Sequence, residues 1–137
     1  MSKLSASLED YLEIICNLLK TGDNVKAVEV AKKLNISRAS VSEALAKLAE
    51  RNLIVYDSHK GITITTEGLK KAQDVILKHN TLTAFFEETL GLKKDVAEDN
   101  ACKIEHVISD DVFKRIMKFQ QYCENNKEIT DNFKKGL

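Results

Sequence analysis

The chain has 137 residues, with 21 basic and 21 acidic side chains, five glycines and no proline. This length suits one compact unit or two small lobes, and the scarcity of glycine and proline favours helices over a turn-rich β fold. The sequence has no apolar run long enough to span a membrane, and its first residues lack the apolar core of a secretion signal. Three cysteines without such a signal indicate reduced thiols, so we expect a cytoplasmic protein.

The first part of the chain contains the pattern of a helix-turn-helix. Apolar residues at helical spacing predict a helix over residues 7–20, which Ser7 would cap, and a second over 26–34. After a turn of three residues, Ser37 would cap a third helix over 38–50. Two helices around so short a turn are typical of helix-turn-helix proteins. On the second and third helices, the side chains expected to face inward are Val28, Val30, Ala31, Leu34, Val41, Leu45 and Leu48.

A β-hairpin is predicted directly after the third helix. Residues 53–56 and 62–65 are rich in β-branched side chains and flank the polar loop 57–61, which contains a glycine. A hairpin at this place is a wing. Thr66 would then cap a long helix over residues 67–79 or beyond.

The rest of the chain predicts helices alone. We expect them over residues 80–90, 94–108 and 110–124, the last capped by Ser109, and a tail from Asn125 that either frays or forms a short helix. The candidates for burial are Phe85, Phe86, Leu90, Ile108, Val112, Ile116 and Phe119. These apolar faces exceed what so small a lobe can hide, which predicts a two-fold dimer.

The predicted fold class is mainly α. Residues 1–74 would form a winged helix-turn-helix DNA-binding domain, and residues 75–137 an all-helical metal-binding and dimerisation domain.

The third helix is the candidate recognition helix for the DNA major groove. Between Lys26 and Lys60 there are seven basic and four acidic residues, a modest surplus that permits contact with phosphates. Base edges would be approached from the start of the helix, and phosphates from basic residues of the helix and wing. The candidate residues are Ser37, Arg38, Ala39, Ser40, Glu43, Lys47, Arg51, His59 and Lys60. The alternative is a winged helix used for protein contacts.

Six side chains are candidate metal ligands. Cys102, Glu105 and His106 share one face of a helix, and thiol, carboxylate and imidazole together suit a divalent transition ion better than calcium or magnesium. Asp10, Glu13 and His79 are further candidates, although each of them taken alone is more typical of a solvated or capping residue. Cys102 taken alone is more typical of a small buried residue. We interpret Cys16 and Cys123 as structural.

An enzyme is not expected. A zinc-peptidase helix needs two histidines and a carboxylate base, but Cys102 occupies the first histidine position. The sequence shows neither a nucleophile–base pair nor a glycine-rich phosphate loop. The alternative function is a winged-helix dimer that senses redox state or a small ligand through Cys102.

Four segments resemble the diphtheria toxin repressor family of metal-dependent regulators. They are SLEDYLEIICNLL, NISRASVSEALAKLAERNLI, TTEGLKKA and CKIEHVIS, and the resemblance extends over about residues 5–124. It implies a homodimer with an N-terminal winged helix and a helical lobe that binds metal, in the short form without an SH3-like domain. Such a dimer would bind a palindromic operator, with ferrous iron or manganese as co-repressor, and close metal-uptake genes when metal is plentiful.

The resemblance also implies a mixed set of ligands. Asp10 matches the manganese branch, Cys102 the iron branch, and Glu105 and His106 both. Glu13 and His79 match the second metal position of the manganese branch, where Glu105 bridges the two ions. Three departures from the iron branch are Thr83 and Glu98 in place of two ancillary ligands, and Glu43 in place of a glutamine.

The donor types predict the order of metals. A thiolate is a softer donor than a carboxylate and discriminates more strongly between ions, so Cys102 outweighs the hard ligand Asp10. We expect Fe(II) as the natural activator and Mn(II) next, with Co(II), Ni(II) or Zn(II) able to bind in vitro. An ion held by both lobes would restrict their relative motion and favour the spacing of recognition helices that fits an operator.

Overall fold

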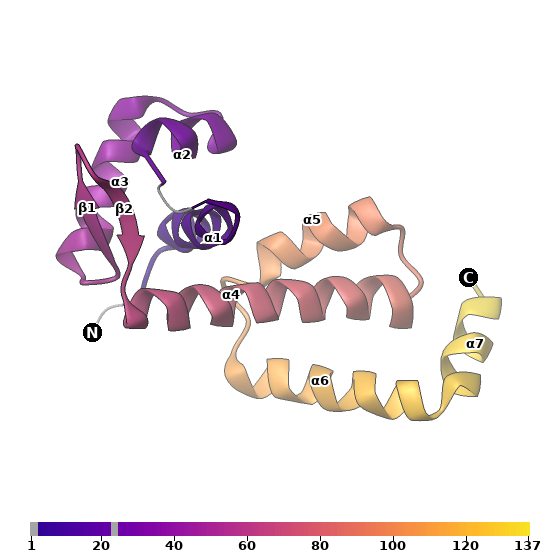
Figure 1. Ribbon diagram of the computed structural model, residues 1–137. Coiled ribbons are helices and arrows are strands. Elements are labelled where there is room, and N and C mark those ends of the chain that lie inside the picture. Colours follow the sequence, from indigo (N-terminus) through magenta and orange to yellow (C-terminus); the bar gives the residue numbers. More distant parts are fainter. Residues whose placement is uncertain (1–2, 23–24) are drawn as a thin grey trace. The chain divides into compact units, whose positions relative to one another are not determined.

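The computed structural model describes residues 3–22 and 25–137. The chain forms two compact units, unit 1 (Met1–Val75) and unit 2 (Ile76–Leu137), and the boundary between them falls within helix α4 (Thr66–Ala84). Figure 1 shows a winged bundle at the N-terminal end and helices alone at the C-terminal end. In the described ranges, none of the helices combines the length and the apolar character needed to cross a bilayer.

Unit 1 begins with three helices, α1 (Ala6–Thr21), α2 (Ala27–Leu34) and α3 (Arg38–Glu50). The cap predicted at Ser7 is wrong, because α1 starts earlier. The extended residue Ser5 precedes it, and its hydroxyl accepts a hydrogen bond from the Leu8 amide at 3.2 Å. The cap predicted at Ser37 is confirmed, since its Oγ accepts from the amide of Ser40.

The turn between α2 and α3 confirms the helix-turn-helix. Asn35 ends α2 in the left-handed conformation (φ 55°), which asparagine tolerates better than most residues, and its amide donates to the carbonyls of Ala31 and Lys32. Residues 35–37 are the whole connection, so α3 leaves α2 after a single tight turn.

The core of unit 1 is aliphatic. The face of α2 that packs inward carries Ala27, Val30 and Ala31, spaced by three and four residues. Val28 lies about a quarter-turn away from this face and is 38% exposed, so the prediction that it points inward is wrong. The completely buried side chains of unit 1 include Leu12, Ile15, Val30, Val41, Leu45, Leu48 and Ile62.

The predicted wing is an antiparallel hairpin of β1 (Ile54–Asp57) and β2 (Gly61–Ile64), with Tyr56 opposite Ile62. It is attached to the helices by a further bridge, in which the Ile62 amide donates to the carbonyl of Val25 at 2.7 Å. Strand β2 of the wing is thereby held, close to the tip of the hairpin, to the residues just before α2.

Thr65, not Thr66, caps α4. The Thr65 hydroxyl accepts from the Gly68 amide at 3.0 Å and lies 2.7 Å from the carbonyl oxygen of Asn52, so it joins the start of α4 to the chain after α3. At Gly68 a side chain has no room, because a Cβ atom would lie 1.9 Å from the carbonyl oxygen of Leu53. This close approach fixes how α4 begins beside the wing.

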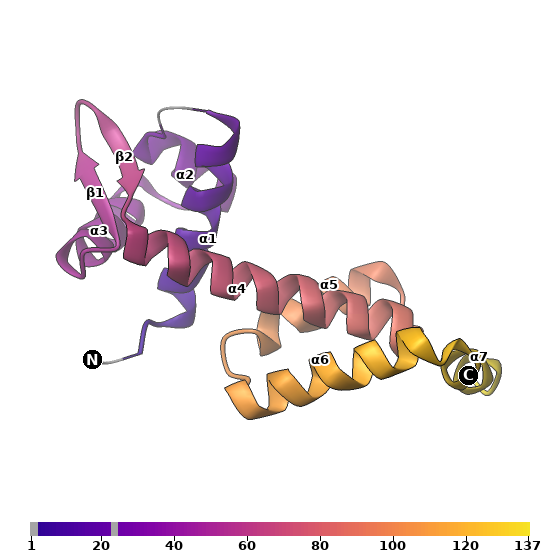
Figure 2. The same ribbon diagram turned by 60° about the horizontal axis from the view of Figure 1, so that its bottom comes forward.

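Unit 2 contains the end of α4, a short π-helical segment η1 (Phe85–Thr89), α5 (Lys94–Ile104), α6 (Asp110–Asn125) and α7 (Lys127–Lys135). The predicted helix 80–90 is not separate, because α4 continues to Ala84 and passes directly into η1. The cap at Ser109 is confirmed, and the tail forms α7. Figure 2 shows α5 and α6 beside the unit-2 part of α4, with α7 following α6.

The core of unit 2 is small. Leu82, Ala97, Ala101 and Phe113 are buried, whereas Phe85, Phe86, Leu90, Ile108 and Ile116 are half-buried. Val112 and Phe119 are 51% and 47% exposed, so their predicted burial is wrong for the single chain. Both lie on a face of α6 that the described part of one chain leaves open.

Candidate functional site

Three of the predicted metal ligands meet in unit 2. His79 comes from α4, Cys102 from α5 and Glu105 from the C-cap position directly after α5. One donor atom of each, an imidazole nitrogen, the thiol sulfur and a carboxylate oxygen, lies within 4.8 Å of the other two. The His79 side chain is partly exposed and Cys102 is exposed, so this group of donors is open to solvent on the side of the thiol.

Glu105 is the buried centre of this group. Its side chain has no exposed surface, and its two oxygens face two imidazoles: Oε2 is 2.7 Å from Nδ1 of His79, and Oε1 is 3.4 Å from Nε2 of His106. A buried carboxylate is costly unless positive charge or donors compensate for it. A divalent cation would supply that charge, and a set of imidazole, carboxylate and sulfur donors fits a transition metal.

The end of α5 explains how the donors are positioned. The predicted helix 94–108 is wrong in length, since α5 ends at Ile104 and residues 105–107 form a turn. The Glu105 amide still donates to the Ala101 carbonyl, so Cys102 and Glu105 remain about one helical turn apart. His106 follows in the turn and is 9% exposed. Cys102 is thus exposed whereas Glu105 and His106 are buried, a difference that is not expected if all three lie on one face of a continuous helix.

The other two predicted ligands lie in unit 1. Asp10 and Glu13 are three residues apart on α1, and both are half-buried. Their participation in a metal site stays a prediction.

Thr83 and Glu98, which stand where the iron branch has two ancillary ligands, are close in sequence to His79 and Cys102 respectively. The Thr83 hydroxyl donates a hydrogen bond to the backbone carbonyl of His79 at 2.8 Å, so it stabilises α4 itself, and Glu98 is exposed on α5.

Lys78, the residue before His79, makes an ion pair of 3.5 Å with Asp110 at the start of α6. Sequence analysis missed this pair, because residues so far apart carry no local signal of contact.

The candidate DNA-binding residues of α3 form an exposed surface in unit 1. Glu43 and Lys47 are one turn apart on it and form an ion pair of 3.3 Å. The hydroxyl of Ser37 is occupied as a cap and donates to Ser40 Oγ at 3.0 Å, which makes its role structural as well. Arg51 is half-buried after the end of α3, and the remaining candidates Arg38, Ala39 and Ser40 are exposed.

The tip of the wing carries His59 and Lys60, both exposed. Asp57 shapes this tip: its Oδ1 accepts from the His59 amide at 2.8 Å and from the Lys60 amide at 3.1 Å. These two hydrogen bonds hold the pKa of Asp57 below its usual range. Sequence analysis treated Asp57 only as part of the loop, although aspartate at the first position of a turn is the signal for this arrangement.

We expect Asp57→Ala to loosen the wing tip and weaken DNA binding severalfold, while Asp57→Asn, which keeps an acceptor oxygen, changes it little. Because the folded-state pKa is lowered, the carboxylate's contribution is present above its ordinary value of 3.8 and is lost only as the pH falls further. The effect should therefore be constant around neutral pH. Titration of labelled DNA with each variant measures it, and equal affinity for wild type and Asp57→Ala would contradict this role.

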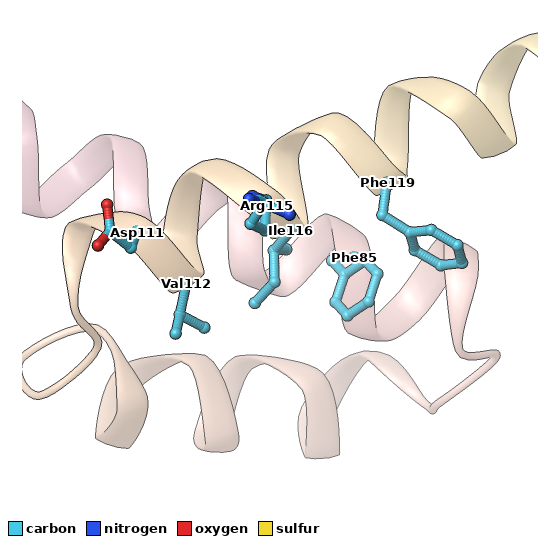
Figure 3. Close-up of a pocket in the computed structure, with 6 residues that line it drawn as sticks. All are labelled: Phe85, Asp111, Val112, Arg115, Ile116 and Phe119. Carbon is cyan, nitrogen blue, oxygen red and sulfur yellow. The ribbon is translucent and has the colours of Figure 1, made fainter.

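An apolar groove of about 580 Å³ lies along α6 and η1 in unit 2. Val112, Ile116 and Phe119 leave α6 on one side, with Phe85 beside them (Figure 3). The rings of Phe85 and Phe119 meet edge to face, with their centroids 6.2 Å apart. Arg115 and Asp111 also line the groove. Exposed apolar surface of this kind is typical of a protein–protein interface.

Two family models match the chain. Residues 3–62 match the N-terminal DNA binding domain of the iron dependent repressor, and residues 65–133 match its metal binding and dimerisation domain. An uncharacterised HTH-type transcriptional regulator of Methanocaldococcus jannaschii is 37% identical over 119 residues, which cover 86% of this chain and 95% of that protein. The diphtheria toxin repressor of Corynebacterium diphtheriae is 30% identical over 118 residues, covering 86% of this chain and 52% of that protein.

Solved structures agree. The manganese regulator SloR superposes with a TM-score of 0.74 at 30% identity, over 84% of this chain and 54% of SloR. The metal-dependent transcriptional regulator MtsR superposes with a TM-score of 0.77 at 27% identity, over 84% of this chain and 54% of MtsR. This chain thus spans about half the length of SloR, MtsR and the diphtheria toxin repressor. With both of its domains matched in order, the chain belongs to the iron-dependent repressor family of metal-dependent transcriptional regulators.

Proposed function

We propose that this chain is a cytoplasmic, homodimeric repressor that binds a palindromic operator when it is loaded with a divalent transition metal, and that it has no enzymatic activity. The observation that carries this proposal is the buried Glu105 carboxylate between His79 and His106, with the Cys102 thiol beside it, in a chain whose candidate recognition helix α3 is exposed on one face. A binding site for a cation and a binding surface for a polyanion in one chain suit metal-regulated DNA binding.

The proposed ligands are Asp10, Glu13, His79, Cys102, Glu105 and His106. Fe(II) is the favoured activator, because a thiolate at position 102 prefers ions later in the Irving–Williams order than manganese. Mn(II) is next, since carboxylates are hard ligands that it accepts readily. Co(II), Ni(II) or Zn(II) would bind in vitro for the same reason that favours iron.

Metal would act on DNA binding through the two units of the chain. The acidic candidates Asp10 and Glu13 belong to unit 1, whereas the other ligands belong to unit 2. An ion that takes donors from both units restricts their relative motion and so favours arrangements of two recognition helices that fit an operator. The ion itself would make no contact with DNA.

The test of the DNA-binding surface is the salt dependence of affinity. Replacing Arg38 or Lys60 by alanine should weaken binding to all DNA sequences similarly and reduce the slope of log affinity against log salt by about one unit per lost phosphate contact. Lys127→Ala on α7, in unit 2, removes the same type of charge from a residue that is not a DNA-binding candidate and serves as the control. Unchanged affinity and slope after removal of either basic residue would contradict this docking.

The homodimer would form through the apolar groove of α6 and η1. Val112→Lys places a charge on this face and should convert the dimer to a monomer at micromolar concentration, because an unpaired charge cannot be buried in an apolar interface. Val28→Lys on α2 is the matched control, since Val28 is also an exposed valine but lies in unit 1. Sedimentation velocity measures the result. A wild-type chain that is monomeric while it binds metal and operator would rule out this assembly.

A second candidate function is favoured by one observation. Cys102 is exposed, whereas Cys16 and Cys123 are buried, so Cys102 is the thiol that an oxidant reaches first. A redox sensor would bind DNA equally well after chelation of metal and would lose binding after oxidation. The metal-dependent repressor would lose binding on chelation alone.

A further inference from the structure

Glu43 is an acidic side chain in the middle of a surface that would face a polyanion. Its side chain is 71% exposed on α3, three residues after Ser40 and four before Lys47, so the three side chains form a row along one face of the helix. Both other members of the row carry hydrogen-bond donors. A carboxylate here cannot contact phosphates favourably, because like charges repel.

Neighbouring groups define where this carboxylate lies. Lys47 Nζ is 3.3 Å from Glu43 Oε1, and both side chains line a depression of about 260 Å³ together with Ser40 and with Tyr11 of α1. Burial, and secondly the negative charge of Glu43, raise the pKa of the Tyr11 phenol, which therefore stays a neutral donor at physiological pH. The carboxylate is thus bordered by hydroxyl and ammonium groups rather than by other acids.

The chemistry of base edges then limits what Glu43 can recognise. An ionised carboxylate only accepts hydrogen bonds. In the major groove, guanine and thymine present acceptors alone, and adenine places its amino donor next to the acceptor N7, which would repel a carboxylate. Cytosine presents its N4 amino donor without an acceptor of its own beside it.

We propose that Glu43 selects a cytosine in each operator half-site by accepting a hydrogen bond from the N4 amino group. Lys47, through its ion pair, offsets the repulsion between this carboxylate and the DNA backbone. The inference rests on the proposed function, because it needs α3 to enter the major groove.

The test is selection of operators from randomised DNA by the full-length, metal-loaded protein. The wild type should enrich cytosine at one position of each half-site, and Glu43→Gln should replace it there by adenine, because a glutamine amide pairs with both N6 and N7 of adenine. Glu50→Gln, which removes the same charge from the last turn of α3, is the control. This variant should select the same cytosine as the wild type. Circular dichroism confirms that each exposed substitution leaves the fold intact.

A base analogue that lacks only the amino group tests the proposed hydrogen bond directly. When the selected cytosine is replaced by pyrimidin-2-one, which lacks the amino group, wild-type affinity should fall about tenfold or more, and the affinity of Glu43→Gln should change less. If Glu43→Gln selects the same cytosine as the wild type, or if the wild type tolerates loss of the amino group, the inference is overturned while the proposed function stands. If the wild type shows no metal-dependent DNA binding, the proposed function fails and this inference fails with it.

Discussion

Replacing His106 with alanine should abolish the activation of DNA binding by every divalent ion. The imidazole is 9% exposed and lies 3.4 Å from the buried carboxylate of Glu105, so alanine removes a donor nitrogen from the interior of the proposed site. Metal effectors typically change affinity by about 5–150-fold, and we expect this factor to fall to near one.

The control for this variant is another histidine. His59→Ala on the wing removes an exposed imidazole and should lower affinity with and without metal, leaving their ratio unchanged. Anisotropy of labelled operator under anaerobic conditions, with and without Fe(II), gives both ratios, and calorimetry gives the metal affinity directly. If His106→Ala keeps the wild-type ratio, His106 is not a ligand and the proposed site is wrong.

Replacing Cys102 with glutamate should shift activation from iron toward manganese. The thiol is exposed and lies within 4.8 Å of donor atoms of His79 and Glu105, so a longer side chain with a carboxylate can be accommodated at the open side of the site. Exchange of a soft donor for a hard one removes the preference for later transition ions. The concentration of Mn(II) needed for half-maximal operator binding should fall relative to that of Fe(II) by about tenfold or more.

Cys123→Ala is the matched control for the thiol, because Cys123 is a buried cysteine of the same unit and is not a proposed ligand. Its metal preference should equal that of the wild type. A wild-type protein that responds to Mn(II) at least as well as to Fe(II), with Cys102→Glu unchanged, would show that the thiolate does not set the preference.

The helix-turn-helix and the wing were predictable because their signals are local. The spacing of Val41, Leu45 and Leu48, the cap at Ser37 and the two β-branched runs each depend on neighbours within a few residues. Where two hydroxyl residues compete within one turn, the same signals are ambiguous. Ser5 rather than Ser7 and Thr65 rather than Thr66 cap their helices, a shift of one or two residues that residue type alone does not decide.

The candidate site was predictable by residue type but not by arrangement. Cys102, Glu105 and His106 are close in sequence, yet Cys102 is exposed whereas Glu105 and His106 are buried, and spacing along one helix face does not predict this difference. The approach of His79 to Glu105, 2.7 Å across 26 positions, depends on how α4 and α5 pack. The exposure of Val112 and Phe119 was likewise not predictable from their apolar character, because it depends on which parts of the chain pack against α6.

We expect metal binding to control DNA binding, so the operator affinity should depend on which ion is present. The operator affinity of the full-length chain is measured anaerobically with Fe(II), Mn(II), Co(II), Ni(II) and Zn(II) in parallel, and again after chelation. We predict tight binding with Fe(II), weaker activation by Mn(II), and a reversible loss on chelation of about tenfold or more. Equal affinity before and after chelation, with loss only after oxidation of thiols, would contradict the claim and favour the redox sensor.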